Sequence, residues 1–456
     1  MTTPTLLRDA AERSISYLES LDVRPVAPTP QAIAALAAFE RSLPDGPQDP
    51  AATLRELDTI GSPATMAMAG PRFFGFVIGG ALPVTVASNW LSVAWDQNTG
   101  LHAPSPGTAA LERIALDWLV ELFGLPKGTG GGFVTGATTA NFTALAAARN
   151  SVLRRAGWNV EADGLFGAPP ITVIIGDEAH PTLLKSLGML GLGRNRVVRV
   201  PVDAQGRMRA DALPAIAGPT IVCAQAGNVN SGAFDPLPAI VAHAHAGGAW
   251  VHVDGAFGLW ALASPTLAHL AAGLVDADSW ATDAHKWLNV PYDSGIAFVR
   301  DPAPLRAAMA ITAEYLPTEG TARNPSDYTP ELSRKARGVD VWAALRTLGR
   351  SGIAAMIERC CAHARTFARE LAAAGCTVHN EVVLNQVVVS FGDAMRTRDV
   401  IARIQADGTL WCGPTIWQGH TAARISVSSW ATTEADVAKS VTAILRCLDH
   451  ARANAA

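Results

Sequence analysis

A lysine at the centre of the segment "ADSWATDAHKWLNVPYDSG", residues 277–295, is the first candidate for chemistry. Lys286 follows His285, and most of the neighbouring side chains are apolar or small. A lysine is rarely buried without a partner, because removing an ammonium group from water is costly. A desolvated, neutral amine is a nucleophile towards carbonyl groups and the usual anchor of a Schiff base. The alternative is a surface lysine at a helix start. Other residues of the chain must therefore distinguish a catalytic Lys286 from a surface one.

The segment "VHVDGAFG" supplies a carboxylate companion. Alternate residues of a strand share one face, so His252 and Asp254 are expected to point the same way. Asp254 also lies where a strand ends and a glycine turn begins, which is the edge where open α/β sheets bind ligands. A carboxylate at this edge can pair with a cationic ring nitrogen, or it can simply cap the turn.

The segment "GGGFVTGATTANFTALAAARN", residues 130–150, predicts an anion cradle at a helix N-terminus. Glycines are followed by the hydroxyls of Thr135, Thr138 and Thr139 and then by an uninterrupted helix. The GK[ST] ending of a nucleotide loop and the GxGxxG pattern are both missing, so one phosphate is the natural occupant. A plain turn with N-capping threonines is the alternative. His180 follows the strand "ITVII" and is expected at the same edge of the sheet.

Histidines in "VAHAHAGGAWVHVD" also suggest a metal site, because His243 and His245 form an HxH pair ahead of Asp254. The segment "PLPAIVAHAHAGG" has a helical pattern, however, and residues two apart on a helix are separated by about 200°. His243 and His245 would then face opposite ways and could not converge on one ion. No metal is therefore predicted.

The composition directs the function towards small molecules. The 456 residues are 49% hydrophobic and 17% charged, and the formal net charge is −4. This balance gives no electrostatic footprint for nucleic acid or for an anionic membrane. The residues 73–95 carry no charge, but Gly79, Gly80 and Pro83 interrupt this run, which favours a deep core over a membrane span.

The cysteines fit a reducing compartment. None of the six forms a CxxC pair or a repeated spacing that would indicate a zinc ribbon or a disulfide framework. The N-terminal segment carries acidic residues and a helical apolar pattern, unlike a signal peptide. We therefore expect a cytoplasmic protein with reduced thiols.

Three parts are predicted along the chain. Residues 1–65 form an N-terminal arm with helices at 5–20 and 30–42, residues 66–340 form a large domain, and residues 341–456 form a small α+β domain. In the large domain, apolar runs alternate with helical stretches, which predicts a largely parallel sheet covered on both faces. The expected strands are 171–177, 196–203, 219–227, 249–256 and 294–300. The small domain is expected to contain a long helix from about 341, strands at "NQVVVSF" and "AARISVSSW", and a closing helix at 434–451.

A cradle, a histidine, a strand-end aspartate and a lysine in this chain order resemble the fold-type I pyridoxal-phosphate enzymes. More narrowly, the chain is similar to the group II amino-acid decarboxylases, which include the aromatic-amino-acid, histidine and glutamate decarboxylases. The likeness runs from "GPRFFGF" to "ARISVSSW". "DAHKW" is similar to the family's N-P-H-K-W, "HVDGAFG" to H-V-D-A-A-x-x-G, "AGNVNSGAFDP" to A-G-T-T-x-x-G-A-F-D-P and "AHPTLLKS" to A-H-x-S.

The resemblance implies an α/β fold with a mostly parallel seven-stranded sheet and a role for each matching residue. Lys286 would hold the aldehyde of pyridoxal 5'-phosphate, Asp254 would pair with the pyridine nitrogen, His180 would lie over the ring, and Ala256 would contact its face. The further residues expected at the cofactor are Ala137, Thr138, Thr139, Asn228, Asp283 and His285. Three departures from the family stand out: Asp283 replaces an asparagine, Asn228 replaces a common threonine, and "GATTAN" replaces a serine-rich turn.

Two further matches concern the reaction. The segment "NPSDYTPELSRKARGVDVW" resembles a mobile catalytic loop, which makes Tyr328 the general acid that reprotonates the substrate α-carbon. The loop "TEGTARNPSDYTP", residues 318–330, has the composition of a lid that excludes water. The strand "AARISVSSW" resembles the one whose arginine, here Arg424, meets the substrate carboxylate.

The implied reaction is decarboxylation of an L-amino acid to its amine, with a slight preference for an aromatic substrate. Rival reactions on the same scaffold are those of an aldehyde synthase, a carbon–carbon lyase or an aminotransferase, and a catalytically silent relative is a further alternative. The resemblance also implies a homodimer with active sites at its interface. Candidates for the substrate pocket are Phe74, Trp95, Trp411 and Trp417 on the apolar side and Asn98 and His102 on the polar side.

Overall fold

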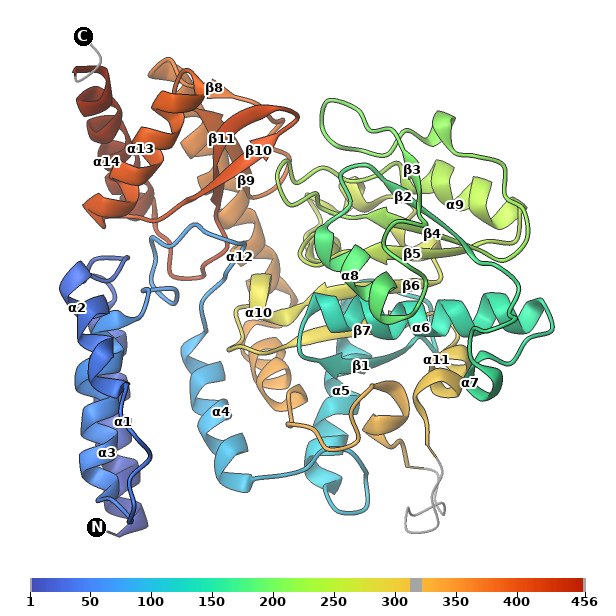
Figure 1. Cartoon of the computed structure of the whole chain (residues 1–456), viewed down its shortest axis with the longest axis horizontal. Coiled ribbons are helices and arrows are strands. Elements are labelled where there is room, and N and C mark those ends of the chain that lie inside the picture. The colour runs from blue at the N-terminus through green and yellow to red at the C-terminus, as the bar shows by residue number, and fades with distance from the viewer. Residues whose placement is uncertain (1, 312–321, 454–456) are drawn as a thin grey trace. The chain divides into compact units, whose positions relative to one another are not determined.

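The computed structural model describes residues 2–311 and 322–453, and the chain divides into two units (Figure 1). Unit 1 comprises residues 1–78, 365–379 and 387–456, and unit 2 comprises residues 79–364 and 380–386. The expected long helix from about 341 is present as α12 (Gly338–Ala373), and its backbone leaves helical geometry at Gly349. Because α12 crosses from unit 2 into unit 1, the two units do not separate at residue 340. The three-part division of the chain stays a prediction.

Unit 2 is built on a seven-stranded sheet with the strand order β1-β7-β6-β5-β4-β2-β3. All neighbouring strands are parallel except β7, which runs antiparallel to both β1 and β6. The predicted mostly parallel seven-stranded sheet is thus confirmed. The strands are β1 (Gly130–Val134), β2 (Thr172–Gly176), β3 (Val198–Val200), β4 (Thr220–Gln225), β5 (Trp250–Asp254), β6 (Ser279–Asp283) and β7 (Gly295–Val299).

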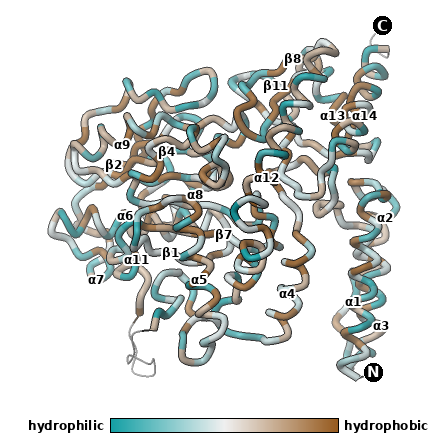
Figure 2. The backbone as a smooth tube through the Cα atoms, turned by 180° about the vertical axis from the view of Figure 1, so that it is seen from behind, coloured by the Kyte–Doolittle hydropathy of each residue, from teal (hydrophilic) through white to brown (hydrophobic). Residues whose placement is uncertain are grey.

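The central strands are buried on both faces, which explains their almost continuous apolar sequences. Every residue of β4, β5, β6 and β7 is buried, and hydrophobic segments recur along the strands in Figure 2. Removing each large aliphatic side chain from water contributes about 1.5–3 kcal/mol to stability. The helices of unit 2 before α12 are α4 (Pro83–Trp95), α5 (Pro106–Leu122), α6 (Ala137–Arg155), α7 (Val160–Asp163), α8 (Pro181–Met189), α9 (Leu237–Ala246), α10 (Ala284–Trp287) and α11 (Pro302–Met309).

Helix α6 positions the site because it packs directly on the sheet. Its buried face consists largely of alanines, including Ala144, Ala147 and Ala148, and these belong to the same core cluster as Ile175 of β2 and Cys223 of β4. Small side chains let the helix axis approach the strands closely, and the first turn lies at the carboxyl edge of the sheet because α6 directly follows β1. The core therefore fixes the end of α6 that the sequence identifies as an anion cradle.

Unit 1 combines the N-terminal helices with a four-stranded sheet of order β10-β11-β9-β8. The expected strands and the closing helix of this region are confirmed as β9, β11 and α14. Arg72, which is 5% exposed, joins these parts because it pairs with Asp436 at 2.8 Å and donates to the carbonyl oxygens of Asp22 and Thr409. The elements are α1 (Thr3–Ser20), α2 (Pro30–Ala35), α3 (Pro50–Glu56), β8 (Thr377–Val378), β9 (Gln386–Ser390), α13 (Ala394–Asp407), β10 (Gly413–Trp417), β11 (His420–Ser426) and α14 (Glu434–Ala453).

The uncharged run 73–95 is divided between an irregular segment and α4. Among residues 2–311 and 322–453, no helix combines the length and the hydrophobicity needed to cross a bilayer.

Candidate active site

A cavity of about 320 Å³ lies at the carboxyl edge of the seven-stranded sheet in unit 2. The strands β4, β5 and β6 end at this cavity with Gln225, Asp254 and Asp283, and α6 begins there. This is the position where open α/β sheets bind ligands. The lining residues are Thr135, Gly136, Ala137, Thr138, Thr139, His180, Thr182, Gln225, Gly227, Val229, Asp254, Ala256, Phe257, Asp283, His285, Lys286 and Tyr292.

Lys286 enters this cavity from α10, the short helix that follows β6. Its side chain is 20% exposed, and the neighbouring Trp287 and Leu288 are fully buried. Its Nζ atom lies 3.0 Å from Oδ2 of Asp283. The ion pair explains how an amine can be held in an apolar segment, and the cavity gives that amine access to a ligand.

Asp254 ends β5 with a carboxylate that is almost completely buried. Its Oδ1 accepts the amide N–H of Ala256 at 3.2 Å, and its Oδ2 accepts Nδ2 of Asn141 at 3.1 Å. The oxygen of that same amide lies 2.8 Å from Nε2 of His252. The expected common direction of His252 and Asp254 is confirmed, because both side chains meet Asn141.

The hydrogen bonds around His252 determine its tautomer. The Asn141 oxygen can only accept, so Nε2 of His252 must carry the proton. Nδ1 then accepts from the hydroxyl of Ser279 at 2.9 Å, and that hydroxyl accepts Nε1 of Trp250. Burial lowers the pKa of His252 to about 3, which keeps the ring neutral. Asp254 therefore belongs to a buried chain of neutral donors and acceptors that fixes its orientation without a second charge.

The first turn of α6 lies at the cavity, where the sequence predicts an anion cradle. Its first amide, that of Ala137, donates to Oδ1 of Asp283 at 2.6 Å. Within residues 2–311 and 322–453, the amides of Thr138 and Thr139 have no acceptor. The first amides of a helix have no partner inside the helix and can therefore bind an anion. The cradle is tightly built, because a Cβ atom added to Gly295 would lie 2.4 Å from the Cα atom of Gly136.

His180 lines the cavity as the N-cap residue of α8. Its Nδ1 accepts the amide N–H of Thr182 at 3.3 Å and lies 2.7 Å from the hydroxyl of the same residue. The amide can only donate, so the neutral ring carries its proton on Nε2. Asn228, in contrast, is absent from the cavity lining. Its Oδ1 accepts the amides of Asn230 and Ser231, so this side chain shapes the turn after β4.

His285 and Tyr292 form one wall beside Lys286. Their rings are stacked with centroids 4.2 Å apart. Nδ1 of His285 accepts the amide N–H of Ser294 at 3.0 Å, and Nε2 lies 3.5 Å from Oδ1 of Asp283. Burial lowers the pKa of His285, so the ring is neutral and its remaining proton faces the carboxylate.

The residues expected to act on the substrate are not part of this cavity lining. Tyr328 ends a short 3₁₀ turn, and its ring is covered by the guanidinium of Arg323 at 4.1 Å. Arg424 lies on β11 in unit 1. Residues 318–321 of the expected lid lie outside the described residues. The candidate pocket residues are likewise absent from the lining: Phe74, Trp411 and Trp417 belong to unit 1, and Trp95, Asn98 and His102 to other parts of unit 2.

Three functional candidates emerge only from the structure: Asn141, Gln225 and Tyr292. Asn141 is four residues after Ala137 on α6, so helical spacing places both on one face. A buried asparagine within an alanine-rich helix is a signal that could have identified it. Gln225 and Tyr292 lie within the segments 219–227 and 277–295, but no motif there indicates that their side chains line the cavity.

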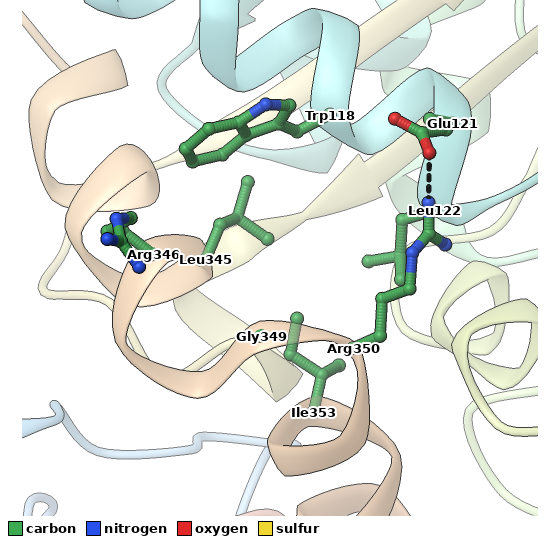
Figure 3. Close-up of a pocket in the computed structure, with 8 residues that line it drawn as sticks. All are labelled: Trp118, Glu121, Leu122, Leu345, Arg346, Gly349, Arg350 and Ile353. Carbon is green, nitrogen blue, oxygen red and sulfur yellow. Dashed lines mark hydrogen bonds and ion pairs between the residues drawn. The ribbon is translucent and has the colours of Figure 1, made fainter.

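A second cavity of unit 2, of about 360 Å³, lies between α5 and α12 (Figure 3). Glu121 and Arg350 form an ion pair of 2.6 Å at its edge. It offers no lysine, histidine, cysteine or hydroxyl group to a ligand. Its lining residues are Trp118, Glu121, Leu122, Leu345, Arg346, Gly349, Arg350 and Ile353.

The predicted histidine geometry away from the sheet edge is also observed. His243 and His245 lie on helix α9, where His243 contacts the carbonyl oxygen of Pro214 and His245 contacts Asp278. Within residues 2–311 and 322–453, no group of three or more metal-ligating acids, histidines or cysteines converges on one point.

Comparison with known proteins places most of the chain in one conserved domain. The pyridoxal-dependent decarboxylase conserved domain matches residues 33–391. Tryptophan decarboxylase 1 of Oryza sativa subsp. japonica is 28% identical over 417 residues, which cover 83% of this chain and 80% of the relative. The aromatic-L-amino-acid decarboxylase of Bacillus atrophaeus is 27% identical over 352 residues, covering 75% and 71%. A phenylacetaldehyde synthase of Arabidopsis thaliana is 28% identical over 335 residues, covering 68% and 67%.

Solved structures share the fold over nearly the whole chain. The crystal structure of Oryza sativa TDC with PLP and tryptamine superposes with a TM-score of 0.90 at 24% identity and covers 98% of this chain and 97% of that one. The crystal structure of mouse CSAD also gives a TM-score of 0.90, at 22% identity, covering 97% and 98%.

Proposed function

Because the chain belongs to the pyridoxal-dependent decarboxylase family, we propose that it converts an aromatic L-amino acid to the corresponding amine and CO₂. The cofactor is pyridoxal 5'-phosphate, and the reaction class is amino-acid decarboxylation. The observation that carries the proposal is the convergence of Lys286, Asp254 and the α6 N-terminus on one cavity. The aromatic preference is supported by the names of the relatives and by Phe257 and Tyr292 in the lining.

The cavity contains a suitable group for each end of the cofactor. The open amides of Thr138 and Thr139 suit the phosphate, the amine of Lys286 suits the aldehyde, and the carboxylate of Asp254 suits the ring nitrogen. Ala256 and His180 line the same cavity. When bound, the cofactor supplies the electron sink for the bond that breaks at the substrate α-carbon.

The buried chain behind Asp254 prepares this carboxylate for its role. Asn141 holds Oδ2, and the neutral His252 offers no competing positive charge. Asp254 can therefore direct its negative charge at a protonated ring nitrogen and keep that proton in place. A carboxylate that rotated freely would hold the proton less firmly, so Asn141 acts as a positioning residue.

Two residues remain proposed on the family likeness. Arg424 would bind the substrate carboxylate. In support, Arg424 is half-buried, and its guanidinium forms no ion pair within residues 2–311 and 322–453. Tyr328 would reprotonate the α-carbon. Since Arg323 covers its ring, this role requires either a rearrangement of the loop or a second copy of the chain.

A second copy of this chain is the proposed partner, with active sites at the interface. Helix α4 shows the reverse of the burial expected for a helix in water. It buries the polar residues Thr85 and Ser92, whereas the apolar side chains of Leu91 and Val93 are 56% and 64% exposed. Its hydrophobic sequence is visible in Figure 2. The amide just before α4, that of Leu82, donates to Asn289 in the Lys286 segment. A copy seated on α4 would thus lie beside the site.

The mass of the protein in solution tests this partner. Leu91→Glu together with Val93→Glu is expected to convert a dimer into a monomer with little activity, as measured by analytical ultracentrifugation and turnover. Gln97→Glu, which adds charge to the exposed segment after α4, is the control and should stay dimeric. A wild-type chain that sediments as a monomer would contradict the proposal.

The cytoplasm remains the proposed location. The six cysteines are buried, and none of them forms a disulfide within residues 2–311 and 322–453, which suits a reducing compartment.

Release of CO₂ from each of the proteinogenic amino acids, followed by identification of the product, tests the proposed reaction. Amine from tryptophan, tyrosine or phenylalanine is expected. Aldehyde as the main product would favour the aldehyde-synthase alternative, which the similarity to a phenylacetaldehyde synthase keeps open. Preference for an acidic or basic substrate would overturn the aromatic assignment alone.

The proton donor can be tested in the same assay. Tyr328→Phe is expected to divert product from amine towards aldehyde, and Tyr315→Phe is the matched change within residues 312–321, outside the described residues. A diversion caused only by Tyr315→Phe would move the role to that residue.

A further inference from the structure

Asp283 places a carboxylate directly in the cradle for the cofactor's phosphate. Its side chain is 2% exposed, and its Oδ1 accepts the first amide of α6, that of Ala137, at 2.6 Å. A helix N-terminus carries about half a positive charge, which favours one nearby anion. Here the protein itself supplies an anion to the same end of the helix that must receive the phosphate.

The second carboxylate oxygen of Asp283 forms an ion pair with Lys286, the residue proposed to bind the cofactor's aldehyde. Oδ2 pairs with Nζ of Lys286 at 3.0 Å. No other cation contacts this carboxylate within residues 2–311 and 322–453. His285 faces Oδ1 at 3.5 Å but is neutral, because burial lowers its pKa. Burial also raises the pKa of Tyr292 to about 12, so that phenol is neutral too.

Binding of the cofactor would therefore disturb both partners of Asp283 at once. A phosphate on the α6 N-terminus shares the helix end with the carboxylate, and the amine of Lys286 is committed to the aldehyde. The buried carboxylate and the phosphate would then compete for one helix end, where charge repulsion would be stronger than in water. An asparagine at position 283 could still accept the Ala137 amide and would add no negative charge.

From these contacts we propose that Asp283 opposes the phosphate of pyridoxal 5'-phosphate, so that this chain binds the phosphate end of its cofactor weakly and exchanges the cofactor readily. The inference rests on the proposed function, because it takes the α6 N-terminus as the phosphate site. It assigns Asp283 to the control of cofactor retention. The chemical step itself remains with Lys286 and Asp254.

Equilibrium titration of the cofactor-free protein tests this role without measuring turnover. Wild type and Asp283→Asn are titrated with pyridoxal 5'-phosphate, with pyridoxal and with inorganic phosphate. The asparagine variant is expected to bind pyridoxal 5'-phosphate and inorganic phosphate at least about tenfold more tightly. The ratio of the affinities for pyridoxal 5'-phosphate and pyridoxal isolates the phosphate term, because changes at Lys286 or in folding affect both ligands.

Asp177→Asn is the matched control. Asp177 is an exposed acid on the same edge of the sheet, just after β2, and it is absent from the cavity lining. Its removal changes the net charge equally and should leave the affinity ratio at the wild-type value. An unchanged or lower ratio in Asp283→Asn would overturn the role of Asp283. Failure of both proteins to bind pyridoxal 5'-phosphate would instead overturn the proposed function.

Discussion

Two of the cavities in unit 2 have similar volumes, about 320 Å³ at the sheet edge and about 360 Å³ between α5 and α12. The sheet-edge cavity gathers an amine, two buried carboxylates, two histidines and open helix amides from segments far apart in the chain. The helix-lined cavity gathers an indole, aliphatic groups, the guanidinium of Arg346 and one exposed ion pair (Figure 3). Volume alone would not distinguish the two.

The two cavities differ in the parts of the helices and strands that form them. Strand ends and a helix N-terminus present unpaired backbone groups and buried side chains whose orientation is fixed from behind. The flanks of two helices present buried aliphatic side chains and charged groups that extend towards water. Convergence of preorganised polar groups, with Asp254 held by Asn141 as the example, is therefore the property that marks the site.

Lys286→Ala should have the largest effect on turnover and would show most clearly which of the two cavities is the active site. The variant loses the amine that binds the cofactor's aldehyde, so turnover should fall by about 10⁴-fold or more. Steady-state decarboxylation measures this loss, and circular dichroism verifies folding. Turnover near the wild-type level would remove the sheet-edge cavity from consideration as the active site.

Asp254→Asn should have the next largest effect. The change preserves shape but removes the charge that keeps a ring nitrogen protonated, so turnover is expected to fall by about 10²–10³-fold while some cofactor binding persists. Turnover and cofactor affinity are measured together. Loss of binding with normal turnover per bound cofactor would contradict the assigned role.

Asn141→Ala tests whether the hydrogen bond that orients Asp254 contributes to turnover. It leaves Oδ2 of Asp254 and Nε2 of His252 without their partners, so turnover should decrease about tenfold with KM nearly unchanged. The unpaired groups should also lower the free energy of unfolding by roughly 1–3 kcal/mol. Asn141→Gln, which retains the amide, should recover part of the turnover. A change confined to stability would make Asn141 merely structural.

Arg350→Ala should have the smallest effect and serves as the counterpart in the helix-lined cavity. The ion pair with Glu121 is exposed, and such pairs contribute only about 0–1 kcal/mol. Turnover should stay within about twofold of wild type, while the unfolding free energy falls by less than about 1 kcal/mol. A large loss of turnover would show that the two cavities are not functionally distinct.

Local sequence signals predicted much of the fold and the chemical centre. The apolar runs at 171–177, 219–227 and 249–256 contain β2, β4 and β5. Strand β1 was missed because it begins with three glycines, which disfavour strands. Tertiary packing explains those glycines: a Cβ atom on Gly131 would lie 2.8 Å from the carbonyl oxygen of Ala297 on β7.

The site was predictable where one segment contains the whole signal. Lys286, Asp254, His180 and the α6 turn each stand in a recognisable motif, and all line the cavity. Tyr292 belongs to the same segment as Lys286, but no motif indicates that its ring stacks on His285 at the cavity. Asn228 belongs to a matching motif but does not line the cavity. Its side chain accepts the amide of Asn230 instead, and the motif does not specify this direction.

Reduction of the cofactor-loaded protein with borohydride, followed by peptide mass mapping, tests the central claim most directly. The account predicts one cofactor-derived mass, located on the peptide that contains Lys286. The same mass on Lys127, Lys185, Lys335 or Lys439, or on no peptide of the loaded protein, would contradict it.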